Sequence, residues 1–146
     1  MKKLFLFAFM ALSITITPGC KLLQPTQIVS PYNAAIVADV VDLGKFVDGF
    51  YSDMETDEDK SFTTSLPGYN AAEVSINSII IRSSVRPKSG LIVKQAELYK
   101  KMLLKFRDEH KAYGTLNNNQ IRIYRRYLAD QLGPLLDSEL SLKQKS

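Results

Sequence analysis

The chain has 146 residues, the size of one ordinary domain. Its 45% hydrophobic and 23% charged content excludes an intrinsically disordered protein. A single cysteine excludes an intramolecular disulfide, and one cysteine with one histidine excludes most zinc sites. The net charge is +4, and without Lys2 and Lys3 it is only +2, too small to indicate nucleic-acid binding.

The first twenty residues have the layout of a secretory signal. Lys2 and Lys3 form a positive start, and residues 4–16 form an uncharged, mostly apolar run. A run of thirteen residues is too short to cross a bilayer as a helix, which takes about 20 residues. The small-residue segment Thr17-Pro18-Gly19-Cys20 follows directly.

With its cysteine after glycine, this segment resembles a bacterial lipoprotein signal peptide, although that family usually has Leu and then Ala or Ser where this chain has Thr17 and Pro18. The resemblance implies a signal peptide over residues 1–19, cleavage before Cys20 and lipid attachment at Cys20, with residues 20–31 as a lipidated tether. Two or three acyl chains would anchor the protein stably in a membrane. The alternative is ordinary cleavage after Gly19, which leaves a free thiol.

The expected location is the cell membrane, with the protein lipid-anchored and facing the periplasm. Lipoproteins retained at the inner membrane typically carry Asp after the cysteine. Lys21 stands there in this chain, so the resemblance slightly favours the outer membrane over the inner one.

A helix is predicted over residues 32–54, with Ser30 as its N-cap and Pro31 at its opening. Its apolar residues recur at steps of four and three: Ile36, Val40, Leu43, Val47, Phe50 and Met54. Gly44 and Gly49 lower helix propensity, and they would allow a neighbouring helix to approach closely.

Residues 55–68 are acidic, then rich in Ser and Thr, and end in Pro-Gly, which predicts a loop. Residues 69–86 are predicted as a second helix, since Asn70 and Glu73 resemble a capping box. Residues 75–81 are rich in β-branched side chains, and a strand is the alternative there. The helix is preferred because no second strand is evident for pairing.

The third and fourth helices follow from similar spacings. The third has an apolar stripe from Ile92 to Tyr113, begins after Ser89 and stops at Gly114. The fourth is expected to be kinked or broken at Gly133-Pro134. Short connections predict an all-α fold, an antiparallel up-down four-helix bundle over residues 32–143.

Charge is unevenly distributed along the chain. Residues 39–59 carry a net charge of −7, whereas residues 82–126 carry +9. The favoured interpretation is that the first helix packs beside the basic helices and neutralises them; the alternative is a surface for a partner or for anionic lipid. Five arginines are the candidates for contact with an anion or partner: Arg82, Arg86, Arg122, Arg125 and Arg126.

Two other features resemble functional sites. Acidic residues alternate from Asp53 to Asp59, but the loop lacks the glycine and the final glutamate of a helix–loop–helix calcium site. His110, the only histidine, lies on the apolar stripe of its helix, and we expect it to close the end of the core with its ring hydrogen-bonded to a neighbouring helix. No metal or cofactor is therefore expected.

These observations predict a membrane-tethered lipoprotein of the bacterial cell envelope with a non-enzymatic interaction or structural role. Its expected partners are the membrane, through acyl chains on Cys20, and an envelope protein; nucleic acid is not expected. The alternative function is a periplasmic helical bundle that binds a lipid or small ligand in its interior.

Overall fold

The computed structural model describes residues 32–143. It consists of four α-helices, and the predicted all-α four-helix bundle is confirmed. Their bounds are α1 Ala34–Thr56, α2 Phe62–Ser84, α3 Gly90–Tyr113 and α4 Asn118–Lys143. Residues 75–81 are helical, so the alternative of a strand is excluded.

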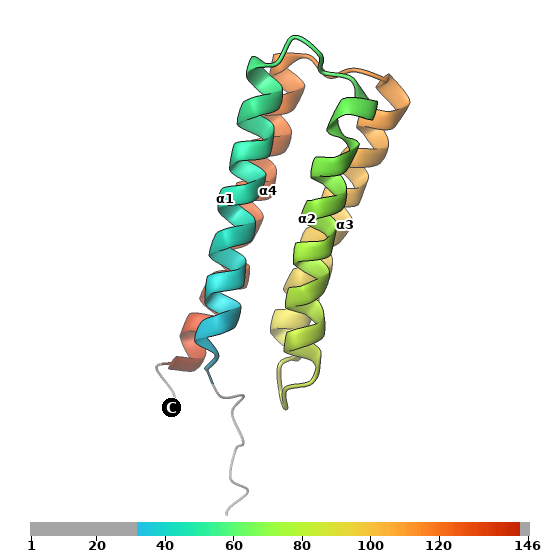
Figure 1. Ribbon diagram of the computed structural model, residues 1–146. Helices are drawn as coiled ribbons and strands as arrows, with labels where there is room; N and C mark the ends of the chain where they lie inside the picture. Colours follow the sequence, from blue (N-terminus) through green and yellow to red (C-terminus); the bar gives the residue numbers. More distant parts are fainter. Residues whose placement is uncertain (1–31, 144–146) are drawn as a thin grey trace, which may run out of the picture.

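The helices form a ring in which each packs against two others: α1 and α3 both contact α2 and α4. Figure 1 shows consecutive helices running in opposite directions, joined by short connections. The two connections at one end are linked, because Phe62 N donates to Gly114 O at 2.8 Å and Leu116 N donates to Lys60 O at 3.4 Å. The chain enters α1 and leaves α4 at the opposite end of the bundle (Figure 1).

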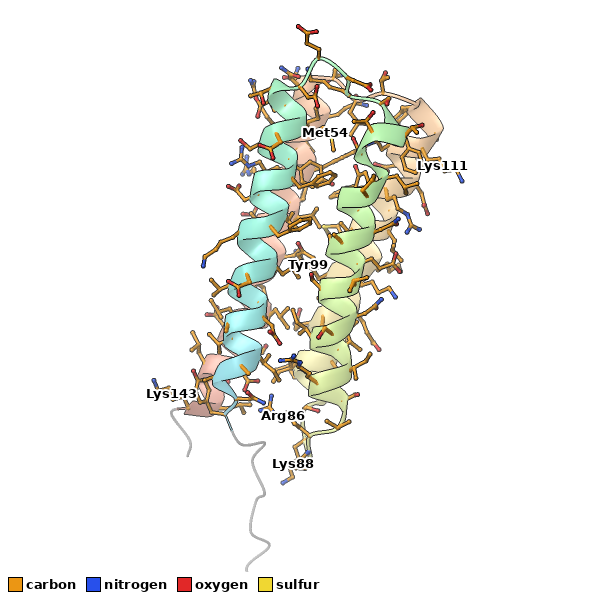
Figure 2. The ribbon with its side chains drawn as sticks, in the orientation of Figure 1. Met54, Arg86, Lys88, Tyr99, Lys111 and Lys143 are labelled. Carbon is orange, nitrogen blue, oxygen red and sulfur yellow. The ribbon has the colours of Figure 1, made fainter. Side chains whose placement is uncertain are left out.

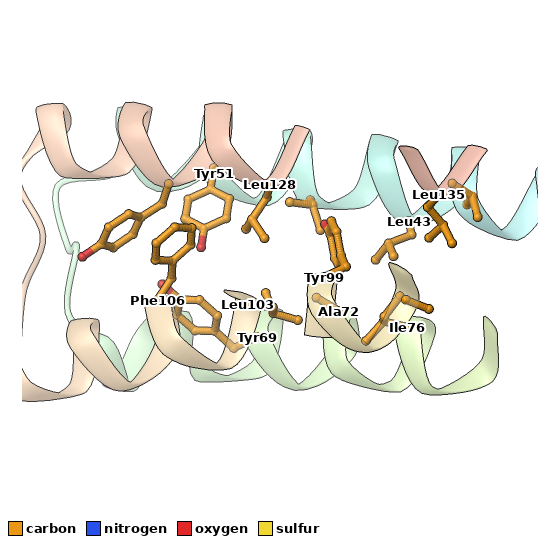
Figure 3. Packing of buried hydrophobic residues seen from close by; sticks show 14 of the residues in the cluster. Leu43, Tyr51, Tyr69, Ala72, Ile76, Tyr99, Leu103, Phe106, Leu128 and Leu135 are labelled. Carbon is orange, nitrogen blue, oxygen red and sulfur yellow. The ribbon is translucent and has the colours of Figure 1, made fainter. Parts of the chain in front are cut away.

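One apolar core runs the length of the bundle (Figure 3). Each helix contributes residues spaced three and four apart, which places them on one face. The largest fully buried side chains include Tyr51, Tyr69 and Tyr99, and Phe106 stacks on Tyr124 with ring centroids 4.1 Å apart. Aromatic side chains therefore fill much of the interior.

Helix α1 begins later than predicted. Its N-cap is Asn33, whose side-chain oxygen accepts a hydrogen bond from Ala35 N at 2.9 Å, so the prediction of Ser30 as the cap is wrong. The predicted core stripe is otherwise confirmed, with one change: Tyr51 is fully buried and Phe50 only partly. Phe50 instead packs edge-on against Tyr69 of α2, with ring centroids 5.1 Å apart.

The predicted loop over residues 55–68 is too long, because α2 already begins at Phe62. The side chain of Ser61 caps it by accepting a hydrogen bond from Thr64 N at 3.4 Å. Pro67 lies inside the helix. Because proline has no backbone N–H, one hydrogen bond is lost, to a carbonyl group in the first turn. The Pro-Gly pair is thus part of a helix and not a turn.

Two glycines mark close contacts between helices. A Cβ at Gly68 would overlap the Phe50 ring, so the missing side chain lets that ring lie against the backbone of α2. A Cβ at Gly44 would lie 3.0 Å from Leu132 Cδ1, whereas one at Gly49 would meet nothing within 4 Å. The close approach expected at both glycines of α1 therefore occurs only at Gly44.

Helices α3 and α4 end close to the predicted positions, but the Ser89 side chain does not cap α3: it donates to Arg86 O at 2.8 Å. Helix α3 stops at Gly114, which has a φ of 76°. Helix α4 begins with a reciprocal cap, since Asn117 and Gln120 each accept the other's backbone N–H at 3.0 Å. The helix continues through Pro134, so it does not break at the Gly133-Pro134 position. The predicted signal peptide and tether, including Cys20, lie outside the described residues.

Candidate functional site

The five candidate arginines do not form one site. Arg82 and Arg86 lie at the end of α2, whereas Arg122, Arg125 and Arg126 lie in the first turns of α4. These segments are at opposite ends of the bundle (Figure 1). The two groups therefore cannot bind one anion together.

Most of these arginines pair with acidic residues of α1. Arg82 lies 3.0 Å from Asp39 Oδ2, and Arg122 Nε lies 2.5 Å from Glu55 Oε1. Arg125 Nε donates to Asp48 Oδ1 at 2.6 Å, and this hydrogen bond holds the pKa of Asp48 below its usual value. The arrangement fits the interpretation that α1 neutralises the basic helices. Because these pairs are exposed, each adds under about 1 kcal/mol to stability.

Arg86 differs from the others because it is buried. Its two terminal nitrogens donate to the two oxygens of Glu139, each at 2.9 Å, and Glu139 is fully buried. Glu139 Oε1 also accepts a hydrogen bond from the backbone N of Asn33 at 2.6 Å. One carboxylate thus connects the end of α2, the last turns of α4 and the residue that caps α1.

Glu139 is absent from the residues predicted as a site. A signal for it exists, since Leu128, Leu132, Leu135 and Glu139 follow one another at steps of four, three and four. A carboxylate on an apolar stripe is expected to be paired when it is buried. The sequence alone does not show that its partner is Arg86, 53 residues away.

His110 occupies the other end of the core and is fully buried. Its Nε2 lies 3.0 Å from Lys60 O, and its Nδ1 lies 3.1 Å from the hydroxyl of Tyr69. Because a carbonyl oxygen only accepts, Nε2 carries the proton and Nδ1 accepts from Tyr69. Burial lowers the pKa of His110, which favours this neutral form. The expectation that His110 closes the core is confirmed.

The acidic loop between α1 and α2 is held by its own hydrogen bonds. Asp57 Oδ1 accepts from Asp59 N at 3.1 Å, and Asp59 accepts from Ser61 N at 3.0 Å and from the Thr64 hydroxyl at 2.6 Å. The bonds from Thr64 and Ser61 lower the pKa of Asp59. Within residues 32–143, no group of three or more potential ligands from His, Cys, Asp and Glu is placed to hold a metal ion.

A shallow groove runs between α3 and α4 on the outside of the bundle, with a volume of about 600 Å³. Its floor is apolar, with Leu98, Met102, Phe106 and Tyr127, and Lys101 and Lys105 stand among its lining residues. The groove is open to solvent, unlike the filled interior in Figure 3. The groove thus combines apolar surface with positive charge.

No family model, no curated protein and no solved structure matches this chain. None of the helices within residues 32–143 is both long enough and apolar enough to cross a membrane.

Proposed function

We propose that this protein is a lipid-anchored component of the bacterial cell envelope, tethered through Cys20, and that its helical bundle has a non-enzymatic interaction or structural role. The proposal begins with the signal-like segment that ends in Cys20. The structural observation that supports it most is the attachment of the chain's entry point to the bundle through Glu139 and Asn33.

The tether would join the bundle at one end and so keep that end nearer the membrane. Eleven residues lie between Cys20 and Tyr32, and a chain of that length spans at most about 40 Å. The end of the bundle that receives the tether carries the exposed Lys88 and Lys143 (Figure 2), which suit an anionic lipid surface. The acidic loop over residues 57–60 lies at the far end, where it would face a partner.

The contacts of His110 also support a role without catalysis. A general base needs a ring nitrogen that can reach a substrate proton. Both nitrogens of His110 are engaged, by Tyr69 and by the Lys60 carbonyl, and the ring is fully buried. The ring therefore links α3 to α2 and to the acidic loop.

The first test is the intact mass of the protein purified from its native membrane. We expect a chain that starts at Cys20 and is heavier by two or three acyl chains. The Cys20→Ser variant should lose this added mass and leave the membrane fraction, whereas Ser13→Ala, a control within the same leader, should keep both. An unmodified chain from the wild type would contradict the anchor.

The groove between α3 and α4 favours a second candidate function, the binding of an amphiphile with a negative head group. The apolar floor would hold the chain of such a molecule, and Lys101 would meet its charge. Native mass spectrometry of the protein should then detect added lipid, which Met102→Glu should abolish and Val74→Glu, on the opposite side of the bundle, should not. Bare protein in every preparation would exclude this candidate.

A further inference from the structure

Helix α2 carries two apolar stripes, and only one of them lies in the core. The inner stripe is buried and comprises Ser65, Tyr69, Ala72, Ile76, Ile79 and Ser83. A second stripe, here called the outer stripe, repeats at steps of three and four on the solvent side and comprises Ala71, Val74, Ser78, Ile81 and Val85. The bundle accounts for the first stripe and leaves the second without a partner.

The large apolar side chains of the outer stripe are mostly exposed to solvent. Val74, Ile81 and Val85 are 68%, 64% and 80% exposed. A three-four spacing of apolar residues is the pattern by which one helix packs against another. From Ala71 to Val85 the stripe is about 21 Å long, at 1.5 Å per residue.

The chemistry around the outer stripe indicates what covers it. Its flanking positions hold Asn70, Asn77, Ser84 and Ser75. The charged residues on its two sides are paired, Arg82 with Asp39 of α1 at 3.0 Å and Glu73 with Arg107 of α3 at 2.8 Å. The nearby Asp42 of α1 pairs with Lys45 at 3.4 Å. The face is therefore neutral. A strongly charged partner would lose its hydration there without gaining an opposite charge, so the face disfavours such a partner.

We infer that the outer stripe is an interface between two copies of this chain. A two-fold axis brings the same surface of each copy together, so a face meets its own charges. The outer stripe meets no like charge in this way, and Asn70 and Asn77 can both donate and accept across the axis. The solvent side of α3 carries the exposed Lys94 and Lys101, which would repel their own copies.

The small residues of the outer stripe favour close helix contact. Ala71 and Ser78 alternate with the larger Val74, Ile81 and Val85, which lets the backbones of two α2 helices approach. Because the contact is short, we expect a reversible dimer with a dissociation constant of about 10 µM. This inference goes beyond the proposed function and does not depend on lipidation.

Sedimentation velocity of the purified full chain, in one detergent and over about 1–300 µM, tests the interface. Wild type should shift from monomer to dimer as concentration rises. Val74→Glu and Ile81→Glu should each raise the dissociation constant at least about tenfold, since each places like charges across the axis. Ile123→Glu, a control at a 50% exposed position of α4, should leave it unchanged.

A gain of association gives an independent measurement that does not depend on a disruptive variant. Ser78→Leu enlarges the apolar contact at the middle of the outer stripe and should lower the dissociation constant at least about threefold. Circular dichroism verifies that all variants stay helical. A wild type that remains monomeric at every concentration, or a dimer that Val74→Glu and Ile123→Glu leave equally intact, would overturn the inference.

Discussion

Arg86 and Glu139 form a bidentate ion pair inside the bundle, with both nitrogen–oxygen distances at 2.9 Å. The Arg86 side chain is 9% exposed and that of Glu139 is fully buried. Glu139 also holds Asn33 N at 2.6 Å, so the pair determines where the N-terminal segment joins the helices. The same carboxylate thus serves the fold and the proposed attachment of the tether.

Glu139→Ala should lower the free energy of unfolding by about 3–5 kcal/mol, because it leaves the Arg86 charge buried without its carboxylate. Chemical denaturation followed by circular dichroism measures this. Asp130→Ala removes the partner of the exposed Arg126 and should cost less than about 0.5 kcal/mol. Replacing both buried partners, as Arg86→Met with Glu139→Leu, should recover much of the loss; equal losses for the two carboxylates would contradict this explanation.

Two glycine substitutions should have opposite effects. Gly68→Ala should destabilise the bundle by about 1–3 kcal/mol, because the new methyl group overlaps the Phe50 ring. Gly49→Ala should stabilise it by about 0.5–1 kcal/mol, since its methyl group meets nothing and alanine favours a helix. Thermal unfolding of the two variants checks the signs. Adding Phe50→Ala to Gly68→Ala should remove most of the steric penalty.

His110 should make stability depend on pH. Burial lowers its pKa in the folded state, so below about pH 6.5 the unfolded chain binds more protons than the folded chain does. The free energy of unfolding should therefore fall as pH drops below 6.5, more steeply in wild type than in His110→Gln. The comparison between the two proteins isolates histidine from the carboxylates that titrate lower. Parallel pH curves for both would contradict the prediction.

Tyr69 and Tyr99 should respond differently to loss of the hydroxyl group. The Tyr69 hydroxyl donates to His110, whereas the hydroxyl of the buried Tyr99 has no hydrogen-bond partner within the described residues. Tyr69→Phe should lose about 1 kcal/mol of stability at pH 7, and Tyr99→Phe should be neutral or stabilising. Urea denaturation of both variants distinguishes the two outcomes.

Burial of tyrosines also predicts sensitivity to alkali. Burial raises the pKa of Tyr51, Tyr69 and Tyr99, that of Tyr69 to about 12. Since the unfolded chain loses these protons near pH 10, stability is fully present below pH 10 and falls as pH rises above it. Tyr99→Phe should reduce this decline, as measured by denaturation at a series of alkaline pH values; an unchanged slope would contradict the argument.

The sequence by itself determined the four helices and most of their inward faces. Spacings of three and four residues predicted α1, α3 and α4 nearly to their ends. The same spacing placed His110 on the apolar stripe of its helix. Local signals were less decisive at Pro67-Gly68, which marks a turn in many sequences. In this chain Phe50, which comes from another helix, occupies the space that a glycine leaves.

Only the tertiary structure decided which apolar stripe of α2 lies inside and which polar groups meet. Ile79, Ile80 and Ile81 are consecutive, yet they are fully buried, partly buried and 64% exposed. Spacing shows that a helix has apolar faces, but the packing of its neighbours selects the face that is buried. The pairing of Arg86 with Glu139 likewise depends on the ends of α2 and α4 coming together. The two residues are 53 positions apart, so the residues around either of them do not indicate the pairing.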